Sequence, residues 1–172
     1  VAAATLNLGL LPGIKRPGIA ISYPTARGIS LLIDVGANIE PTAEHLFQYA
    51  VMADIYARYI FKKRRPTIGL LNIGTEESKG TGLLKETYKL LRDSQLNFVG
   101  NIEGRDLFTG QCDCVICDGL VGNIVLKMFE SVAETAVALI KREIMKSLTA
   151  KIGAWLCKPA LAAIQRETDY EE

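Results

Sequence analysis

The stretch TIGLLNIGTEESKG, at residues 67–80, decides the fold. It opens as an apolar run that breaks at Asn72. The polar segment after the break carries glycines and charged side chains: Gly74, Glu76, Glu77, Lys79 and Gly80. A helical pattern follows. In open α/β sheets, ligands bind where buried strands end in such loops. The stretch therefore predicts a strand that delivers a loop to a ligand site.

Three other stretches repeat this form. They are ISLLIDV before Gly36-Ala37-Asn38, residues 96–99 before GNIEGRD, and residues 113–117 before DGLVGN. ISLLIDV (residues 29–35) is nearly continuously apolar, which is typical of a strand buried on both faces of a parallel sheet. Helical patterns at residues 42–61 and 83–92 separate the strands. This alternation predicts crossover connections and a mainly parallel sheet.

The two ends of the chain complete the predicted architecture. We expect the end of a helix at residues 1–11, a strand at 18–22, a turn at 23–28, and long helices at 121–148 and 150–167. The predicted fold class is α/β, with a mainly parallel doubly wound sheet and a C-terminal helical hairpin. Residues 1–148 should form the α/β domain and residues 149–172 an amphipathic extension. Val1 begins within a pattern, without a leader or initiator methionine, so we expect a fragment of a larger domain.

The composition favours a globular protein that does not bind nucleic acid. Hydrophobic residues make up 49% and charged residues 23%, enough apolar content to argue against disorder. The formal net charge is only +1, and no basic run is interleaved with aromatic residues. KKRR at residues 62–65 is typical of a solvated helix end. No apolar run reaches the roughly 18 residues that a membrane span needs.

The cysteines and the single histidine are not expected to carry chemistry. Strand alternation places Cys112 and Cys114 on one face and Cys117 on the other, so we predict no metal site and buried, reduced thiols. His45 is expected to be a surface or capping residue. The sequence lacks a G-x-S-x-G elbow, a Walker A motif and a G-x-G-x-x-G fingerprint. A reaction would therefore depend on positioning and electrostatics, without a protein nucleophile, and we expect no cofactor.

The carboxyl ends of parallel strands meet at one edge of a sheet, so the four loops should lie together. Glycines would let backbone amides approach a ligand, and helix N-termini would favour an anion. Turn and cap formation is the alternative explanation, because turns also need glycine and asparagine. The predicted site comprises these residues: Gly36, Asn38, Asn72, Gly74, Glu76, Glu77, Lys79, Gly80, Asn101, Glu103, Arg105, Asp106, Asp118, Asn123 and Lys127.

The two C-terminal helices carry more apolar surface than one sheet-facing stripe requires. For residues 121–144 we expect a dimer interface, and the alternative is a helix sunk in a larger domain. The tail SLTAKIGAWLCKPALAAIQRE sets a tryptophan and aliphatic residues against basic ones, the pattern of a helix in a bilayer interface. Its expected membrane-facing residues are Leu148, Ile152, Trp155 and Leu156. Pro159 should kink or break this helix, and packing on a neighbouring helix is the alternative role.

Long segments resemble the bacterial phosphate acyltransferase family of phospholipid synthesis. They are LLIDVGANIEPTAEHLFQYAVMADIYA, RPTIGLLNIGTEESKG, NFVGNIEGRDLFTGQCDCVICDGLVGNIVLK and the tail from KREIMKSL to TDYEE. The resemblance implies transfer of a fatty acyl group from acyl-acyl carrier protein to inorganic phosphate. It also implies a fold like phosphotransacetylases and isopropylmalate-type dehydrogenases, a homodimer, and a cytoplasmic protein peripherally bound to the inner face of the membrane. There the acyl phosphate would pass to a membrane acyltransferase.

Residue chemistry and this resemblance together suggest roles. Phosphate would itself be the nucleophile, so the protein must bind an anion and stabilise a thioester oxyanion. The expected anion-binding cations are Lys79, Arg105 and Lys127, and the expected donors are Asn72, Asn101 and Asn123. The acidic residues expected to orient cations or move a proton are Glu76, Glu77, Glu103 and Asp118. Two rivals are a short-chain phosphate acetyl- or butyryltransferase using coenzyme A, and a non-catalytic dimeric ligand-binding module.

Overall fold

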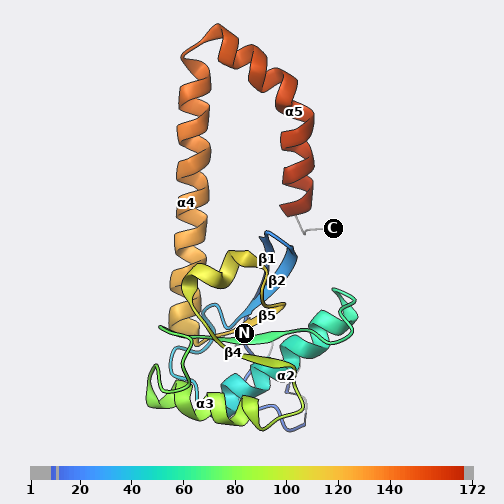
Figure 1. Ribbon diagram of the computed structural model, residues 1–172, viewed down its shortest axis with the longest axis vertical. Helices are drawn as coiled ribbons and strands as arrows, with labels where there is room; N and C mark the ends of the chain where they lie inside the picture. Colours follow the sequence, from blue (N-terminus) through green and yellow to red (C-terminus); the bar gives the residue numbers. More distant parts are fainter. Residues whose placement is uncertain (1–8, 11, 169–172) are drawn as a thin grey trace. The chain divides into compact units, whose positions relative to one another are not determined.

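A computed structural model of the chain describes residues 9–10 and 12–168 (Figure 1). It divides into two compact units, Val1–Ile124 and Val125–Glu172, which are described separately below. The helix end expected at residues 1–11 lies almost wholly outside the described residues; Gly9 and Leu10 are not helical. The domain boundary expected at residue 148 stays a prediction.

The first unit is built on a five-stranded sheet in the order β1-β2-β5-β3-β4. The strands are β1 (Ala20–Thr25), β2 (Gly28–Ile33), β3 (Ile68–Leu71), β4 (Phe98–Ile102) and β5 (Cys114–Ile116). The last four are mutually parallel, whereas β1 pairs with β2 in antiparallel fashion. The predicted mainly parallel sheet is therefore confirmed, with four strand ends at one edge.

Helices α2 (Ala43–Tyr59) and α3 (Gly82–Arg92) contact each other and belong to one buried cluster with the sheet. Small residues on α2, such as Ala50 and Ala53, let it approach β2 and β5 closely. Its N-terminus is a capping box. The Thr42 amide donates to His45 Nδ1 at 3.0 Å, and the His45 amide donates to Thr42 Oγ1 at 3.3 Å. His45 is thus a capping residue, as predicted.

Two strand predictions were wrong in their limits. The turn expected at residues 23–28 is mostly strand, because β1 and β2 form a hairpin in which Thr25 faces Gly28. The strand expected at residues 96–99 instead runs over Phe98–Ile102. Gly100 has φ +98° but pairs with Gly69 in the ladder, next to an irregularity in β3. Pairing with β3 overrides the turn preference of the glycine, and it places Asn101 inside a strand.

The cysteine faces also differ from the prediction. Cys114 packs under α2, where its thiol lies 3.5 Å from the Ala53 carbonyl oxygen. Cys112 Sγ lies beside Gly69, on the face of the sheet opposite to Cys114. The side chains do not alternate regularly here, because the Asp113 and Cys114 amides both donate to the Thr67 carbonyl. All three strand-region cysteines are buried and unpaired, as expected. Within the described residues no acidic, histidine or cysteine group suits a metal ion.

The second unit contains most of α4 (Gly119–Met145) and all of α5 (Leu148–Thr168). The chain reverses direction between the two helices, which form the predicted hairpin (Figure 1). Ser147 Oγ accepts the Ala150 amide at 3.2 Å and caps α5. The helix runs through Pro159 without a break, although its ribbon bends along its length (Figure 1). No helix within the described residues is long and apolar enough to cross a bilayer.

Candidate functional site

The loop after β2 is organised by a buried carboxylate, that of Asp34. Its Oδ1 atom accepts the amides of Ile19, Gly36 and Ala37 at 3.0, 3.1 and 2.9 Å. Its Oδ2 atom accepts the Asn38 amide at 2.8 Å. Asp34 is 0% exposed, so these four bonds compensate its desolvation. The expectation that the amides of this loop face a ligand is therefore wrong: they point inward.

Asn38 is also tied into the interior. Its Nδ2 atom donates to the Pro17 carbonyl, Asp34 Oδ2 and the Tyr49 hydroxyl at 2.9, 3.2 and 2.6 Å. Its Oδ1 atom accepts from Arg16 at 3.3 Å. Burial, followed by the nearby Asp34 charge, raises the pKa of Tyr49 to about 12, so its hydroxyl stays protonated. Asn38 is thus a structural link between the loop and an arginine at its rim.

The first turn of α4 packs closely against this loop, and its glycines permit the approach. The Gly119 amide donates to the Asn38 carbonyl at 2.8 Å, and a Cβ at Gly119 would lie 2.6 Å from that oxygen. A Cβ at Gly122 would overlap the Asp34 carbonyl oxygen. The DGLVGN stretch therefore needs these two glycines for helix packing against the loop.

Two further candidates lie at the start of α4. Asp118 Oδ1 accepts the Val121 amide at 2.9 Å, so this carboxylate caps the helix. Asn123 is exposed, and its side chain lies 3.7 Å from the position a Cβ at Gly36 would take. The structure therefore brings Gly36, Asn38, Asp118 and Asn123 together, and among them Asn123 has the exposed polar side chain.

The loop after β3 has a different construction. Asn72 is 8% exposed; its Nδ2 atom donates to the Lys79 carbonyl at 3.2 Å, and its Oδ1 atom accepts the Ile73 amide at 2.8 Å. Gly74 leaves space that a Cβ would fill, 2.9 Å from Glu76 Oε2 and 3.0 Å from Lys79 Cγ. The side chains of Glu76 and Lys79 therefore extend across the glycine, and both residues are exposed.

Asn101 joins this loop to β4. Its Nδ2 atom donates to the Glu76 carbonyl at 2.9 Å, and its Oδ1 atom is buried without a hydrogen-bond partner among the described residues. The Asn72 amide continues the ladder by donating to the Ile102 carbonyl at 2.9 Å. Asn72 and Asn101 are therefore clamps on the loop backbone in this structure, whereas we expected them to be free donors to a substrate.

The charged candidates divide into paired and unpaired groups. The paired ones are Glu77 with Arg92 (2.8 Å), Glu103 with Arg105 (3.2 Å) and Lys127 with Glu130 (2.8 Å). Asp106 Oδ2 accepts the Glu103 amide at 3.0 Å and starts the 3₁₀ helix η1 (Gly104–Thr109). Lys127 belongs to the second unit. Within the described residues, Lys79 has no carboxylate partner.

This geometry can be set beside known proteins. The model of a family described as "Fatty acid synthesis protein" matches residues 1–172. The chain belongs to the fatty acid synthesis protein family. It is 48% identical over its whole length to a phosphate acyltransferase of Thermodesulfovibrio yellowstonii, and it covers 50% of that protein. It is 49% identical over 98% of its length to a phosphate acyltransferase of Campylobacter lari, covering 51% of that chain.

The chain spans about half the length of the curated relatives it matches. Solved structures agree on the fold. The EutD phosphotransacetylase from Staphylococcus aureus gives a TM-score of 0.59 at 16% identity, over 76% of this chain and 46% of that one. A phosphotransacetylase from Streptococcus pyogenes gives 0.56 at 21% identity, over 72% and 44%. The predicted phosphotransacetylase-like fold is confirmed.

For this member of the fatty acid synthesis protein family, the three buried thiols are poor candidates for a nucleophile. Burial, followed by the charge of Asp113, raises the pKa of Cys112 to about 11 and that of Cys114 to about 12. Burial, followed by Asp118 and Asp34, raises the pKa of Cys117 well above its usual value. These groups stay protonated at neutral pH, in line with the expected core role.

Sequence reasoning missed Asp34 and Arg16. Asp34 falls within the predicted apolar strand at residues 29–35, and Arg16 lies between the elements predicted at residues 1–11 and 18–22. A signal was available for Asp34: an acidic residue at the end of an otherwise apolar run, directly before a glycine, has loop amides within reach. Arg16 had no such local signal, because its contact with Asn38 spans 22 positions of sequence.

Proposed function

We propose that the protein carrying this chain transfers an acyl group from a thioester to inorganic phosphate. The observation that carries the proposal is the loop after β3, where Lys79 is exposed at the carboxyl edge of the sheet and has no carboxylate partner within the described residues. Membership of the family and the phosphate acyltransferase relatives support the same reaction class. The proposed mechanism requires no protein nucleophile, because phosphate itself attacks the thioester.

In the proposed reaction a phosphate oxygen attacks the thioester carbonyl carbon. A carbon–oxygen bond forms, and the carbonyl oxygen becomes an oxyanion. When this tetrahedral species collapses, the carbon–sulfur bond breaks, and the leaving thiolate takes up the proton that the attacking hydrogen phosphate gives up. Acyl phosphate and a free thiol are the products. A cation such as Lys79 would hold the phosphate and offset developing negative charge, the type of interaction that contributes most in such transfers.

The test is to replace Lys79 with alanine in the full-length protein and measure acyl phosphate by hydroxylamine trapping. We expect the rate to fall about 100-fold, because removal of one charge-stabilising donor typically costs that much. The matched control is Lys85→Ala, an exposed lysine on α3, which should keep the wild-type rate. A Lys79→Ala enzyme within a few-fold of wild type would remove Lys79 from the proposal.

We also propose that the acyl donor is acyl-acyl carrier protein and that the product serves phospholipid synthesis. The family's description as a fatty acid synthesis protein supports a carrier-bound fatty acyl donor. The rival donor is coenzyme A, used by a phosphate acetyl- or butyryltransferase; the phosphotransacetylase-like fold alone does not separate the two. Assay of both thioesters side by side discriminates them. Faster transfer from coenzyme A thioesters would contradict the carrier-protein proposal.

For the helical hairpin we propose a homodimer contact on α4. Apolar residues of this helix are exposed in the single chain, among them Met128, Val132 and Ile140. Such a surface needs a partner in water. The Val132→Glu variant of the full-length protein should dissociate in light scattering coupled to gel filtration. The control is Gln95→Glu, which adds the same charge at an exposed position of the first unit. A dimeric Val132→Glu protein would contradict the proposal.

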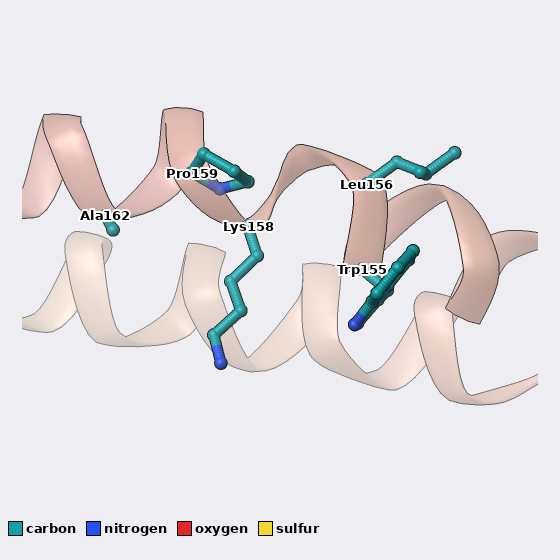
Figure 2. A pocket seen from close by; sticks show the side chains of 5 residues that line it. All are labelled: Trp155, Leu156, Lys158, Pro159 and Ala162. Atoms are coloured by element: carbon teal, nitrogen blue, oxygen red, sulfur yellow. The ribbon is translucent and has the colours of Figure 1, made fainter.

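For α5 we propose contact with a membrane surface. Leu148, Ile152, Trp155 and Leu156 are 78, 60, 72 and 65% exposed. Trp155, Leu156, Lys158, Pro159 and Ala162 line an open, mainly apolar hollow of ≈ 520 Å³, in which the Trp155 ring and the Lys158 amine extend from the same side of the helix (Figure 2). An indole beside an ammonium suits the interface between acyl chains and headgroups.

Liposome co-sedimentation tests this surface. Trp155→Glu in the full-length protein should abolish binding to anionic vesicles, because the charge would lie at the apolar contact. Gln95→Glu again serves as the control for the added charge, and it should bind as wild type. Unchanged sedimentation of Trp155→Glu would exclude this face of α5.

A further inference from the structure

Arg16 lies beside the loop after β2 on a segment that is anchored on both sides. On one side, the Lys15 amide donates to Gln48 Oε1 at 3.0 Å, and Gln48 Nε2 donates to the Gly13 carbonyl at 2.8 Å. On the other, the Pro17 carbonyl accepts from Asn38 at 2.9 Å. The backbone that carries Arg16 is thereby fixed to α2 and to the loop. The position of the Arg16 Cα atom, from which the side chain extends, is therefore well defined.

The guanidinium group is itself oriented. One of its nitrogens donates to Asn38 Oδ1 at 3.3 Å, and Asn38 is 6% exposed. Asn38 is in turn held by Asp34 and Tyr49, both 0% exposed. A guanidinium offers five N–H donors in a rigid fork, so one bond to Asn38 leaves donors for a ligand. The buried Asn38 side chain therefore orients the guanidinium group of Arg16 beside the loop after β2.

The charge of Arg16 is not compensated by a carboxylate within the described residues, whereas the charges of Lys15, Arg105 and Lys127 are. Lys15, the preceding residue, forms an ion pair with Glu44. Arg105 and Lys127, expected from sequence to bind an anion, are paired with Glu103 and Glu130. The positive charge of Arg16 acts on its surroundings: burial is the first cause that lowers the pKa of His45, and Arg16 is the next. Arg16 resembles Lys79 in this respect.

The amides of Gly36, Ala37 and Asn38 are not free to bind an anion, because they are committed to Asp34. An anion at this strand end would need a side-chain donor. We propose that Arg16 is an anion-binding residue of the site and takes a phosphate-type group; this inference rests on the proposed function. Two sources share that chemistry. They are inorganic phosphate and the phosphodiester of the thioester donor's phosphopantetheine arm. A planar guanidinium matches the geometry of either group.

The test compares Arg16→Gln, Arg16→Lys and two control variants of the full-length protein. Lys15→Gln removes the neighbouring charge of the same segment, and Arg64→Gln removes an exposed charge before β3, at the amino end of the strands. Steady-state acyl phosphate formation gives KM for phosphate and for the thioester separately. Calorimetric titration with inorganic phosphate and with holo-acyl carrier protein gives binding without turnover.

We expect Arg16→Gln to raise one of these constants about 10- to 100-fold, the usual effect of losing a hydrogen bond between charged groups. A rise confined to phosphate identifies inorganic phosphate as the ligand. A rise confined to the acyl carrier protein thioester and holo-acyl carrier protein identifies the phosphodiester. Arg16→Lys should recover part of the loss because it keeps the charge but not the fork. Both controls should bind as wild type.

Wild-type values for Arg16→Gln in both titrations would overturn the inference, as would equal losses in Lys15→Gln and Arg64→Gln, which would indicate a general effect of charge. Failure of the proposed function looks different. In that case wild-type protein forms no acyl phosphate from either thioester, and the titrations alone decide on Arg16. Far-ultraviolet circular dichroism of each variant checks the fold, which an exposed arginine should not alter.

Discussion

The loops after β2 and β3 both contain glycine and asparagine, yet they direct their polar groups in opposite ways. After β2, a buried carboxylate collects the backbone amides, and the exposed cation, Arg16, comes from a different segment. After β3, buried asparagine side chains hold backbone carbonyls, and the loop displays its own charged side chains. The first loop is a fixed platform, whereas the second presents charged side chains to solvent. Residue composition alone does not distinguish these two constructions.

The largest effect is expected at Asp34, because the loop after β2 depends on this one carboxylate. Asp34→Asn would replace a charged acceptor of four backbone amides with a side chain whose NH2 group opposes some of them. We expect the free energy of unfolding of the full-length protein to fall by about 3–5 kcal/mol, as for other broken buried charge networks. Urea denaturation followed by circular dichroism measures this.

Asp93→Asn is the control for Asp34→Asn. Asp93 is a surface residue at the end of α3, with a side chain 68% exposed, and its change should cost less than about 0.5 kcal/mol. If the two variants lose similar stability, the loop after β2 is not organised by Asp34, and the contrast between the two loops disappears.

The loop after β3 should respond to a change in its backbone. Gly80 has φ +85°, and a Cβ there would lie 2.5 Å from Asn72 Oδ1. Gly80→Ala should therefore lower the free energy of unfolding by about 1–3 kcal/mol, through strain and through displacement of the Asn72 clamp. The rate of acyl phosphate formation should fall by more than the loss of folded protein explains, because the Asn72 side chain holds the backbone of Lys79.

Gly82→Ala, two residues later, separates strain from a general effect of adding a methyl group. A Cβ at Gly82 meets nothing within 4 Å, and the residue opens α3 with helical backbone. This variant should be neutral or more stable by about 0.4–1 kcal/mol. Equal destabilisation of both variants would mean that the loop tolerates no change near α3, and Gly80 would have no special role.

The sequence predicted the strands and their common edge because burial leaves a local signature. ISLLIDV and TIGLL are continuous apolar runs, and the glycines after them mark the strand ends. It did not predict where polar groups point. Asn38, Asn72 and Asn101 look alike as loop residues, yet all three are buried and engaged with backbone or side-chain partners.

The remaining misses have the same cause, which is pairing across long stretches of sequence. Gly100 reads as a turn residue until its partner Gly69 is known, and Arg16 reads as a loop residue until Asn38 is placed beside it. Lys79 is exposed, and an exposed lysine in a glycine-rich loop needs no long-range partner to be accessible; its anion-binding role stays a prediction. Local sequence therefore suggested exposed candidates such as Lys79, but it could not predict contacts between distant segments such as that of Arg16 with Asn38.

The smallest expected effect concerns the hydrogen bond from Asn38, in the loop after β2, to the Tyr49 hydroxyl, and it depends on pH. The pKa of Tyr49 is raised to about 12, above the unfolded value of about 10, because burial and then the charge of Asp34 disfavour the phenolate. Its contribution to stability is therefore complete below about pH 10 and is lost as the pH rises through about 12. Tyr49→Phe removes this titration.

At neutral pH, Tyr49→Phe should lower the free energy of unfolding by about 0.5–1.5 kcal/mol, the usual value of one hydrogen bond, here that from Asn38. Between about pH 10 and 12 the variant should lose stability less steeply than wild type, in urea denaturation at each pH. Tyr59→Phe, at an exposed position, should follow the wild-type curve. If Tyr49→Phe also follows it, the hydroxyl of Tyr49 does not support Asn38, and the platform rests on Asp34 alone.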